Sequence, residues 1–556
     1  MYRRTTAGKL ARPQCLVATH RNRPRECNMN RLIPARAAAS LICMVCLIAG
    51  LGIATSPAAA QPVSSTGADA DVGVGEVLFD RWFVVQLQGQ PAGWMHSRTT
   101  RTGAVVQSHE QMKLVVRRGE STQETRVDTR FRETVTGDPL STSIELNVSA
   151  VAMSTRIRFL RDQMLVETEQ FGRVSQEKQP LPDKPWLTPM ASQRYLEKRI
   201  AAGDDAIDMR SFDPMSRRLI TLTMTRQDES EVQVLGKVRP AIAWEVRKSD
   251  APNIAMTMYT DEVGQMLRTQ IELLPGMTLT LIEADESLAT AEVNPPEVLA
   301  KTFVQVEGEL PRPRETTSAI YELRIKPDDK GQSIETDLPR TGSQRVVWGD
   351  RQTARIAVDL TTPVNPMADT PKAAHLNRSA MIDSDDEQIV ALRAQALGED
   401  DAPAQRPARA EALRQFVHQY IDQKDLSVGF ASASETARTA QGDCTEHAVL
   451  LAALLRADGV PSRVVSGVVY VDEFLGHTGV FGYHMWTQAW LGEDTQAGGR
   501  WVDLDATLNR LTPYDAAHIA LAVSPMEDAA GFNDFMSMAP LIGRLSIRVI
   551  DVGHAE

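Results

Sequence analysis

The sequence predicts an α+β protein in which antiparallel β-rich domains precede a C-terminal domain that contains helices. Hydrophobic and polar residues alternate through much of residues 78–365, a period of two that is typical of strands with one buried face. After residue 386 the apolar positions follow a helical period instead. Prolines cluster between these regions, at residues 295–296, 311–313 and 363–371, and indicate boundaries.

Residues 1–60 have the pattern of a secretory signal peptide. They hold nine basic residues and one acidic residue, and an uncharged apolar run from Ala37 to Ala54 precedes an A-x-A site at 58–60. An uncleaved signal anchor is the alternative, because the apolar run is nearly long enough to span a bilayer. We expect cleavage, and therefore a protein that is exported to the periplasm or out of the cell.

The net charge of the chain indicates which classes of binding partner are expected. The chain has a formal net charge of −12 at pH 7, and removal of residues 1–60 would leave −20. An acidic balance of this size counts against nucleic acid and anionic membrane surfaces as partners. No later stretch is long and apolar enough to cross a membrane, so we expect no membrane span after signal cleavage.

The region before the first proline cluster predicts a flexible leader, residues 61–77, and an antiparallel β-rich domain, residues 78–300. Glycines at 89, 119 and 264 fall where hairpin turns would lie. One helix is expected near residues 191–202. The clearest alternating segments are residues 82–87, 125–131, 144–148 and 277–281.

Residues 312–365 predict a small β domain, since residues 320–325 and 354–358 alternate again. Residues 366–386 predict a linker. Its acidic end, with Asp383, Asp385 and Asp386, is interpreted as a helix N-terminus rather than a calcium site, because the spacing does not follow a calcium loop.

The one cysteine in the body of the chain begins a predicted core helix. Four of the five cysteines lie before residue 47, so Cys444 has no disulfide partner. It follows Gly442 and precedes a run, residues 448–455, that is apolar nearly all round. A helix N-terminus stabilises a thiolate, and we expect a lowered pKa for Cys444. The alternative is a small buried hydrophobic residue.

A cysteine nucleophile needs a base and a group that orients the base. Three strands are predicted after the helix, at residues 464–471, 483–490 and 501–507. His484 and Asp505 lie on the second and third strands, where cross-strand neighbours come within reach. Helix and strands together can therefore assemble Cys444, His484 and Asp505.

Four ordered motifs resemble those of the transglutaminase-like superfamily, whose signature runs G-[DQ]-C, G-[IV]-P-x-R, H-x-W and W-x-x-x-D-x-T. The resemblance covers about residues 410–510 and implies a papain-like core within a catalytic domain at residues 387–525. It implies Cys444 as nucleophile, His484 as general base and acid, and Asp505 as the carboxylate that orients His484. Residues 526–556 are expected to be a C-terminal tail with a strand. The motifs here are Gly442-Asp443-Cys444, Gly459-Val460-Pro461-Ser462-Arg463, His484-Met485-Trp486 and Trp501-Val502-Asp503-Leu504-Asp505-Ala506-Thr507.

Other residues compete for these roles. His447 lies one turn after Cys444, but one cysteine without an obvious third ligand makes a poor zinc site, and we expect no metal and no cofactor. His477 could replace His484 as base, although the H-x-W motif favours His484. Asp503 is expected to lie on the opposite strand face from Asp505, and the D-x-T motif favours Asp505. Trp486, Trp490 and Trp501 are interpreted as core or cleft-wall residues.

The chain departs from animal transglutaminases, which place a tryptophan before the cysteine to stabilise the oxyanion. No tryptophan lies between Trp348 and Trp486, and Gln441 is the only substitute we suggest. Crosslinking of the animal type is therefore not implied. The expected function is cysteine-dependent acyl transfer on amide bonds of peptides or proteins, including those of the cell envelope, with hydrolysis slightly favoured over transamidation. The alternative is a non-catalytic cell-envelope binding or scaffold protein with a relic core.

Overall fold

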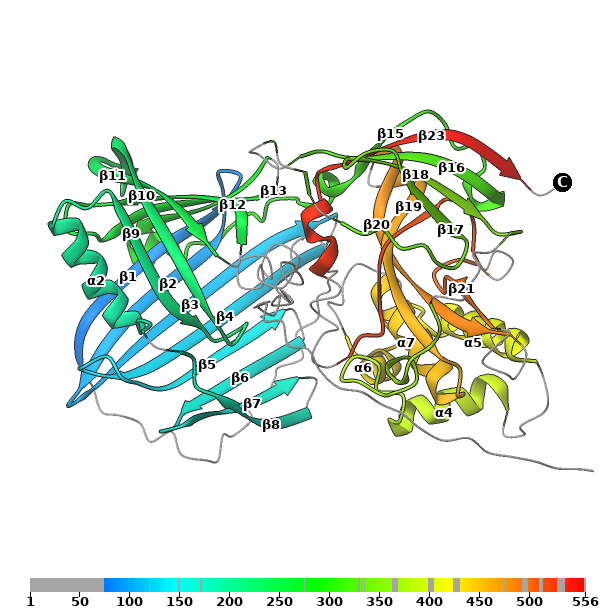
Figure 1. Cartoon of the computed structure of the whole chain (residues 1–556), viewed down its shortest axis with the longest axis horizontal. Helices are drawn as coiled ribbons and strands as arrows, with labels where there is room; N and C mark the ends of the chain where they lie inside the picture. The colour runs from blue at the N-terminus through cyan, green and yellow to red at the C-terminus, as the bar shows by residue number, and fades with distance from the viewer. Residues whose placement is uncertain are drawn as a thin grey trace, which may run out of the picture.

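The computed structural model describes residues 75–554, apart from 120, 149–150, 171–172, 184, 250, 275, 328–330, 332, 335, 363–368, 399–404, 424–430, 475, 493–498, 510–513 and 528–535. The predicted signal peptide, nearly all of the predicted leader and the start of the predicted linker lie outside the described residues. The predicted fold class is confirmed: an antiparallel N-terminal sheet precedes a C-terminal domain of helices and strands (Figure 1).

The N-terminal part is one fourteen-stranded antiparallel sheet. Each strand pairs with its neighbour in the chain, except that β1 pairs with β14 while β8 and β9 form the edges. The predicted helix is present as α2 (Pro189–Ala201), whose Leu196 and Ile200 pack into a cluster with Trp244. The strands are β1 (Glu76–Leu87), β2 (Gln90–Thr102), β3 (Val105–Arg118), β4 (Ser121–Thr134), β5 (Pro139–Val148), β6 (Val151–Phe159), β7 (Gln163–Gln170), β8 (Arg173–Pro180), β9 (Ala206–Asp213), β10 (Arg218–Val234), β11 (Lys237–Lys248), β12 (Ala251–Thr260), β13 (Met266–Leu274) and β14 (Met277–Ala284).

The C-terminal part contains a nine-stranded sheet in the order β17-β18-β16-β23-β15-β20-β19-β22, with β21 also paired to β20. Its strands come from three separate stretches of the chain: β15 (Val304–Glu307), β16 (Thr316–Ile325), β17 (Gln344–Trp348) and β18 (Thr353–Asp359); β19 (Ser462–Phe474), β20 (His477–Leu491), β21 (Arg500–Leu504) and β22 (His518–Ser524); and β23 (Leu545–His554).

This sheet corrects the prediction of a separate small β domain at residues 312–365. Strands β16, β17 and β18 pair with one another, but β16 also pairs with β23 from the end of the chain. Strand β23 in turn pairs in parallel with β15, which pairs with β20. Alternation predicts that a strand exists and which face is buried, but not which distant strand completes its hydrogen bonds.

Four helices pack beside this sheet and share its hydrophobic core, which is built around α7, buried from Thr445 to Arg456. The predicted acidic helix start is confirmed, because the Asp386 side chain accepts a hydrogen bond from the N–H of Gln388 at 2.9 Å. The helices are α4 (Glu387–Leu397), α5 (Arg406–Tyr420), α6 (Ala433–Thr439) and α7 (Cys444–Ala457), with short turns of helix at α3 (Glu286–Ala289), η1 (Leu299–Thr302), η2 (Pro313–Glu315), η3 (Ala373–His375) and η4 (Met536–Leu541).

The two parts meet beside β20. Figure 1 shows them as two lobes with η4, in red, between them. The backbone of Arg117, near the end of β3, bonds to Pro296 and Val298, just before η1, and η1 contacts β20. The N-terminal sheet therefore reaches the strand that carries His484.

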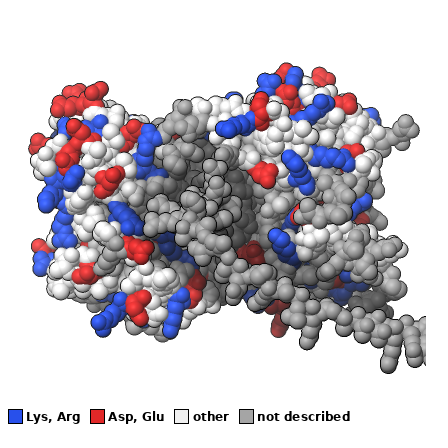
Figure 2. All heavy atoms as spheres, in the orientation of Figure 1, with Lys and Arg blue, Asp and Glu red and all other residues white. Residues whose placement is uncertain are grey.

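The face of the molecule shown in Figure 2 carries basic and acidic residues interspersed, with no continuous area of one sign among the residues drawn in colour. Within the described ranges, no helix combines the length and the hydropathy needed to cross a bilayer.

Candidate active site

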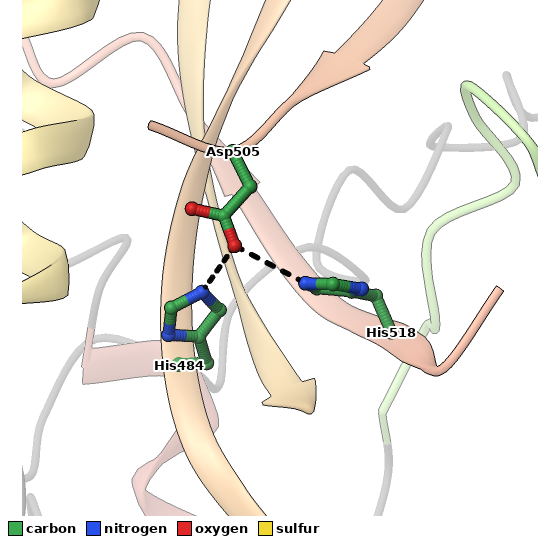
Figure 3. A group of neighbouring side chains, drawn as sticks. All are labelled: His484, Asp505 and His518. Atoms are coloured by element: carbon green, nitrogen blue, oxygen red, sulfur yellow. Dashed lines mark hydrogen bonds and ion pairs between the residues drawn. The ribbon is translucent and has the colours of Figure 1, made fainter. Parts of the chain in front are cut away.

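Two histidines share one carboxylate oxygen (Figure 3). His484 on β20 lies with Nε2 2.8 Å from Oδ2 of Asp505, which directly follows β21. His518, the first residue of β22, places its own Nε2 3.3 Å from the same oxygen. Because an ionised carboxylate only accepts hydrogen bonds, the two nitrogens that face Asp505 carry protons. Neutral His484 then has its free electron pair on Nδ1, which points away from Asp505.

Asp505 is held through its second oxygen. Oδ1 accepts hydrogen bonds from the backbone N–H of Thr507 at 2.8 Å and from the Thr507 hydroxyl at 2.7 Å. Burial would raise the pKa of the Asp505 carboxyl, but His484 and His518 lower it well below its ordinary value. The carboxylate is therefore ionised and fixed in orientation. The threonine of the D-x-T motif therefore holds the aspartate of the same motif in place.

His518 was not among the residues predicted from the sequence. Its side chain is fully buried, and its Nδ1 lies 2.9 Å from Oδ1 of Asp515. Burial alone would lower the pKa of His518, but Asp515 and Asp505 outweigh it and raise this pKa to about 9. His518 is thus a buried imidazolium between two carboxylates at neutral pH. The sequence signal, an aspartate three residues before a histidine, is too common to have identified it.

Cys444 is the first residue of α7, as predicted, and a tight turn precedes it. The Asp443 side chain accepts from the N–H of Thr445 at 2.8 Å, while the Glu446 carboxyl accepts from the N–H of Asp443 at 3.0 Å, which completes a capping box. Gly442 has φ +155°, and a Cβ there would lie 2.3 Å from that of Glu446. Glycine is therefore required at the turn that positions the thiol.

The expected lowering of the Cys444 pKa is wrong for the free protein. Burial raises the pKa of this thiol well above its ordinary value, and the Asp443 carboxylate adds to the rise. A hydrogen bond from the backbone of Met485 acts in the opposite direction but is outweighed. The capping box thus brings carboxyl groups to the N-terminus of α7, where they oppose the positive end of the helix dipole. The thiol is neutral at rest and must transfer its proton to a base in order to react.

Cys444, His484 and Asp505 all line one cavity of about 430 Å³. Its walls are predominantly apolar and come from both parts of the chain. The N-terminal part and its connection supply Arg118, Leu299 and Phe303. The C-terminal part supplies, besides the three predicted residues, Arg314, Asp443, Thr445, Val469, Val471, Phe474, Gly482, Tyr483, Met485, Thr507, Leu508, Met538 and Ile542.

The alternative histidines have other positions. His477 is exposed at the start of β20 and packs edge-on against Phe303. His447 is buried, and its Nδ1 lies 2.6 Å from the carbonyl oxygen of Asp443. Neither residue, nor Gln441, is among the described residues that line the cavity. The oxyanion role suggested for Gln441 is therefore not supported by its position.

Asp503 has a structural role, but the expectation that it lies on the opposite strand face is wrong. Alternate residues of a strand share a face, and Asp503 bonds to side chains from the face of β20 that also carries His484. Its Oδ1 accepts from Nε1 of Trp486 at 3.0 Å and from Gln488 at 2.7 Å, and its Oδ2 accepts from the backbone N–H and the hydroxyl of Ser343. The three tryptophans of the motifs, Trp486, Trp490 and Trp501, are buried in the core.

His484, Asp505 and His518 are also the one group of described residues whose spacing could hold a metal ion, since the candidate ligand atoms lie within 4.8 Å of one another. The hydrogen bonds fit a different assignment. Both nitrogens of His518 face carboxylates, and its raised pKa of about 9 keeps both protonated at neutral pH. A protonated imidazole has no electron pair for a metal. The donor set therefore fits a chain of ion pairs better than a metal centre.

Comparison with known proteins identifies part of this domain. Residues 391–506 match the family model described as the transglutaminase-like superfamily. The chain therefore contains a transglutaminase-like core over these residues, and the predicted resemblance is confirmed. No curated protein matches the chain.

Three solved structures show similarity at low identity. A β-barrel-like protein of a domain of unknown function from Brucella abortus is 11% identical with a TM-score of 0.30, over 38% of this chain and 98% of that one. A candidate cysteine protease from Cytophaga hutchinsonii is 16% identical with a TM-score of 0.24, over 43% and 84%. A candidate protease from Parabacteroides distasonis is 11% identical with a TM-score of 0.17, over 66% and 67%. The assignment of the core rests on the family model.

Proposed function

We propose that this protein is an exported, cysteine-dependent acyl-transfer enzyme that attacks amide bonds of peptide or protein substrates. The main support for this proposal is the hydrogen bond from Nε2 of His484 to the buried carboxylate of Asp505, in the cavity that Cys444 also lines. A nucleophile, a base and a group that orients the base are the parts that acyl transfer requires.

The chemistry follows from the protonation states. Nδ1 of His484 accepts the thiol proton of Cys444 as Sγ attacks the carbonyl carbon, and a C–S bond forms while the carbonyl oxygen becomes an oxyanion. The C–N bond then breaks, and His484 returns its proton to the leaving amine. Water or a second amine attacks the thioester, and His484 takes the proton of this nucleophile. The C–S bond then breaks, and His484 returns that proton to the sulfur, which restores the thiol.

Asp505 stabilises the imidazolium that forms at His484 during each half of this cycle. It is ionised and fixed by Thr507, so no reorganisation is needed when the charge appears. The neutral resting thiol fits the same scheme, because proton transfer to His484 is then coupled to the approach of substrate.

The cavity favours an acyl donor with an apolar group. Its apolar walls include Val469, Val471 and Phe474, and burial of such a group there contributes binding energy. Nothing in the proposed chemistry calls for a cofactor or a metal. Hydrolysis remains slightly favoured over transfer to an amine. Export rests on the sequence of residues 1–60, and nucleic acid is not a proposed partner because of the acidic charge balance.

The test uses p-nitrophenyl acetate, whose acyl group a reactive thiol accepts. The wild type should release a burst of nitrophenol and carry one acetyl group, which peptide mapping by mass spectrometry should locate on Cys444. Cys444→Ala should show neither, and His484→Ala should lose the burst. His477→Ala, on the exposed start of the same strand, is the matched control and should behave as the wild type.

Equal labelling of the wild type and Cys444→Ala would contradict the proposal. It would favour the non-catalytic binding or scaffold protein with a relic core. The retained pair of His484 and Asp505 supports the enzyme over that alternative.

A further inference from the structure

We propose that Arg118, at the end of β3 in the N-terminal sheet, binds a negatively charged oxygen of the substrate beside the sulfur of Cys444. The reacting site would then be built from both parts of the chain. This inference rests on the proposed function and deepens it, because it assigns a role to a residue 326 positions before the nucleophile.

The backbone around Arg118 is tied to the segment that leads into the C-terminal part. The N–H of Arg117 donates to the carbonyl of Pro296 at 2.8 Å, and the N–H of Val298 donates to the carbonyl of Arg117 at 3.0 Å. The N–H of Gly119 donates to the Glu297 carboxylate at 3.2 Å. These bonds fix the end of β3, and the Arg118 side chain lines the cavity that holds Cys444.

The Arg118 guanidinium is buried with two hydrogen-bond donors unused. The residue is 5% exposed, and its Nε and Nη1 have no hydrogen-bond partner within the described part of the chain. A buried donor left without an acceptor is costly. A substrate oxygen that entered the cavity could accept from one of these donors, because the planar guanidinium presents five N–H groups that suit an anionic oxygen or a carboxylate.

The second arginine of the cavity is already paired. Arg314 forms an ion pair with the buried carboxylate of Asp515 at 2.8 Å and also donates to the backbone carbonyl of Tyr470. Arg118 is therefore the cavity arginine with unused donors, over the residues that the structure describes.

The electrostatic neighbours of Arg118 place its charge near the nucleophile. Burial lowers the pKa of Arg118, whereas Asp443 and then Cys444 are the strongest influences that raise it. A cation near Sγ also offsets the negative charge of the capping box, which otherwise opposes formation of the thiolate.

Two substrate groups could supply the negative oxygen. One is the oxyanion that forms from the attacked carbonyl, a role for which the chain has no tryptophan between Trp348 and Cys444 and for which Gln441 is misplaced. The other is a carboxylate on the acyl donor. Both present an anionic oxygen to a guanidinium, and the acylation experiment below separates them.

The first experiment needs no acyl transfer. Cys444 in the full protein is alkylated with iodoacetate, which is anionic, and with neutral iodoacetamide, and the ratio of the two rates is compared among variants. Arg118→Gln should lower the iodoacetate-to-iodoacetamide ratio by about tenfold, because a nearby cation attracts the anionic reagent. Arg118→Lys should retain most of the ratio. Arg117→Gln is the matched control, since Arg117 is adjacent on β3 but exposed, and should leave the ratio unchanged.

The second experiment measures acylation of Cys444 by two esters, p-nitrophenyl butyrate and the mono-p-nitrophenyl ester of succinic acid. If Arg118 serves the oxyanion, Arg118→Gln should slow acylation by both esters about 10- to 100-fold. If Arg118 binds a carboxylate of the donor, only the succinate ester should slow. Thermal unfolding of each variant accompanies both experiments, and rates are compared for the folded protein.

An unchanged alkylation ratio together with unchanged acylation in Arg118→Gln would overturn the inference. Failure of the proposed function looks different. The wild type would then acylate with neither ester, while the alkylation ratio would still report whether Arg118 acts on anions beside Cys444.

Discussion

His484 and His518 both hydrogen bond to Oδ2 of Asp505, at 2.8 and 3.3 Å. The two contacts have different consequences. His518 is fully buried and permanently charged at neutral pH, so it helps to keep Asp505 ionised. His484 lines the cavity together with Cys444 and is the ring that we propose exchanges a proton with this thiol. The Asp505 carboxylate thus takes part in two pairs, a structural one with His518 and one with His484, the proposed base.

Replacement of Asp505 should separate catalysis from folding. We expect Asp505→Asn to slow acylation of Cys444 by at least about 100-fold, because an amide can face His484 with a donor and reverse its tautomer. Asp503→Asn is the control, since Asp503 bonds only to residues of the core among its described contacts. It should lower the melting temperature while the folded fraction acylates at a rate near that of the wild type. Equal acylation rates in the two variants would argue against the role of Asp505.

The buried imidazolium predicts how stability depends on pH. The folded pKa of His518 is about 9, above the ordinary 6.5, so its contribution is complete below pH 6.5 and is lost as the pH rises through 9. The shift corresponds to about 3 kcal/mol. Denaturant unfolding of the wild type should show this loss, and His518→Gln should flatten the decline between pH 6.5 and 9. The exposed His477→Gln should follow the wild-type curve, and a His518→Gln curve parallel to the wild type would contradict the assignment.

The raised pKa of Cys444 predicts its reactivity in the absence of substrate. Alkylation by iodoacetamide should rise with pH along a curve whose midpoint lies above that of an ordinary thiol, because burial and the Asp443 carboxylate disfavour the thiolate. Asp443→Asn should shift this midpoint downward while it keeps a side chain that can cap α7. A midpoint below the ordinary thiol value in the wild type would show that the helix N-terminus and Arg118 outweigh burial.

The turn before the nucleophile should not tolerate a side chain. Gly442→Ala would place a Cβ 2.3 Å from the Cβ of Glu446 at a φ of +155°, so we expect a loss of about 3 kcal/mol or more in unfolding free energy and poor acylation of Cys444. Gly459→Ala is the matched control. Its φ is also positive, at +72°, but its Cβ would meet no atom within 4 Å. It should cost only about 1 kcal/mol, and equal losses in the two variants would contradict the steric argument.

The motifs predicted which parts of the site come from the transglutaminase-like core. Cys444 begins a helix, His484 lies on β20, and Asp505 directly follows β21, which pairs with β20; the order of the motifs indicated such an arrangement. Two residues of the site escaped prediction. His518 begins a later strand and belongs to no motif, and Arg118 is brought to the cavity by contacts between parts of the chain that lie far apart in sequence.

The wrong predictions of a separate small β domain and of a lowered Cys444 pKa have one physical origin. Local periodicity predicted the strands at residues 320–325 and 354–358, yet their sheet is completed by β23 from the C-terminus and is continuous with β20. The direction of the Cys444 pKa was also judged from local structure, as a helix N-terminus, whereas burial in the assembled cavity decides it. Properties that depend on which distant segments pack together are not contained in a local pattern.

The central claim is that Cys444 transfers acyl groups from amides. The most direct measurement is mass spectrometry of a cell-envelope peptide extract after incubation with the wild type and with Cys444→Ala under identical conditions. We expect the wild type to cleave, or join to an amine, a defined set of amide bonds, and these products to be absent from the Cys444→Ala sample. The same products in both samples would contradict it.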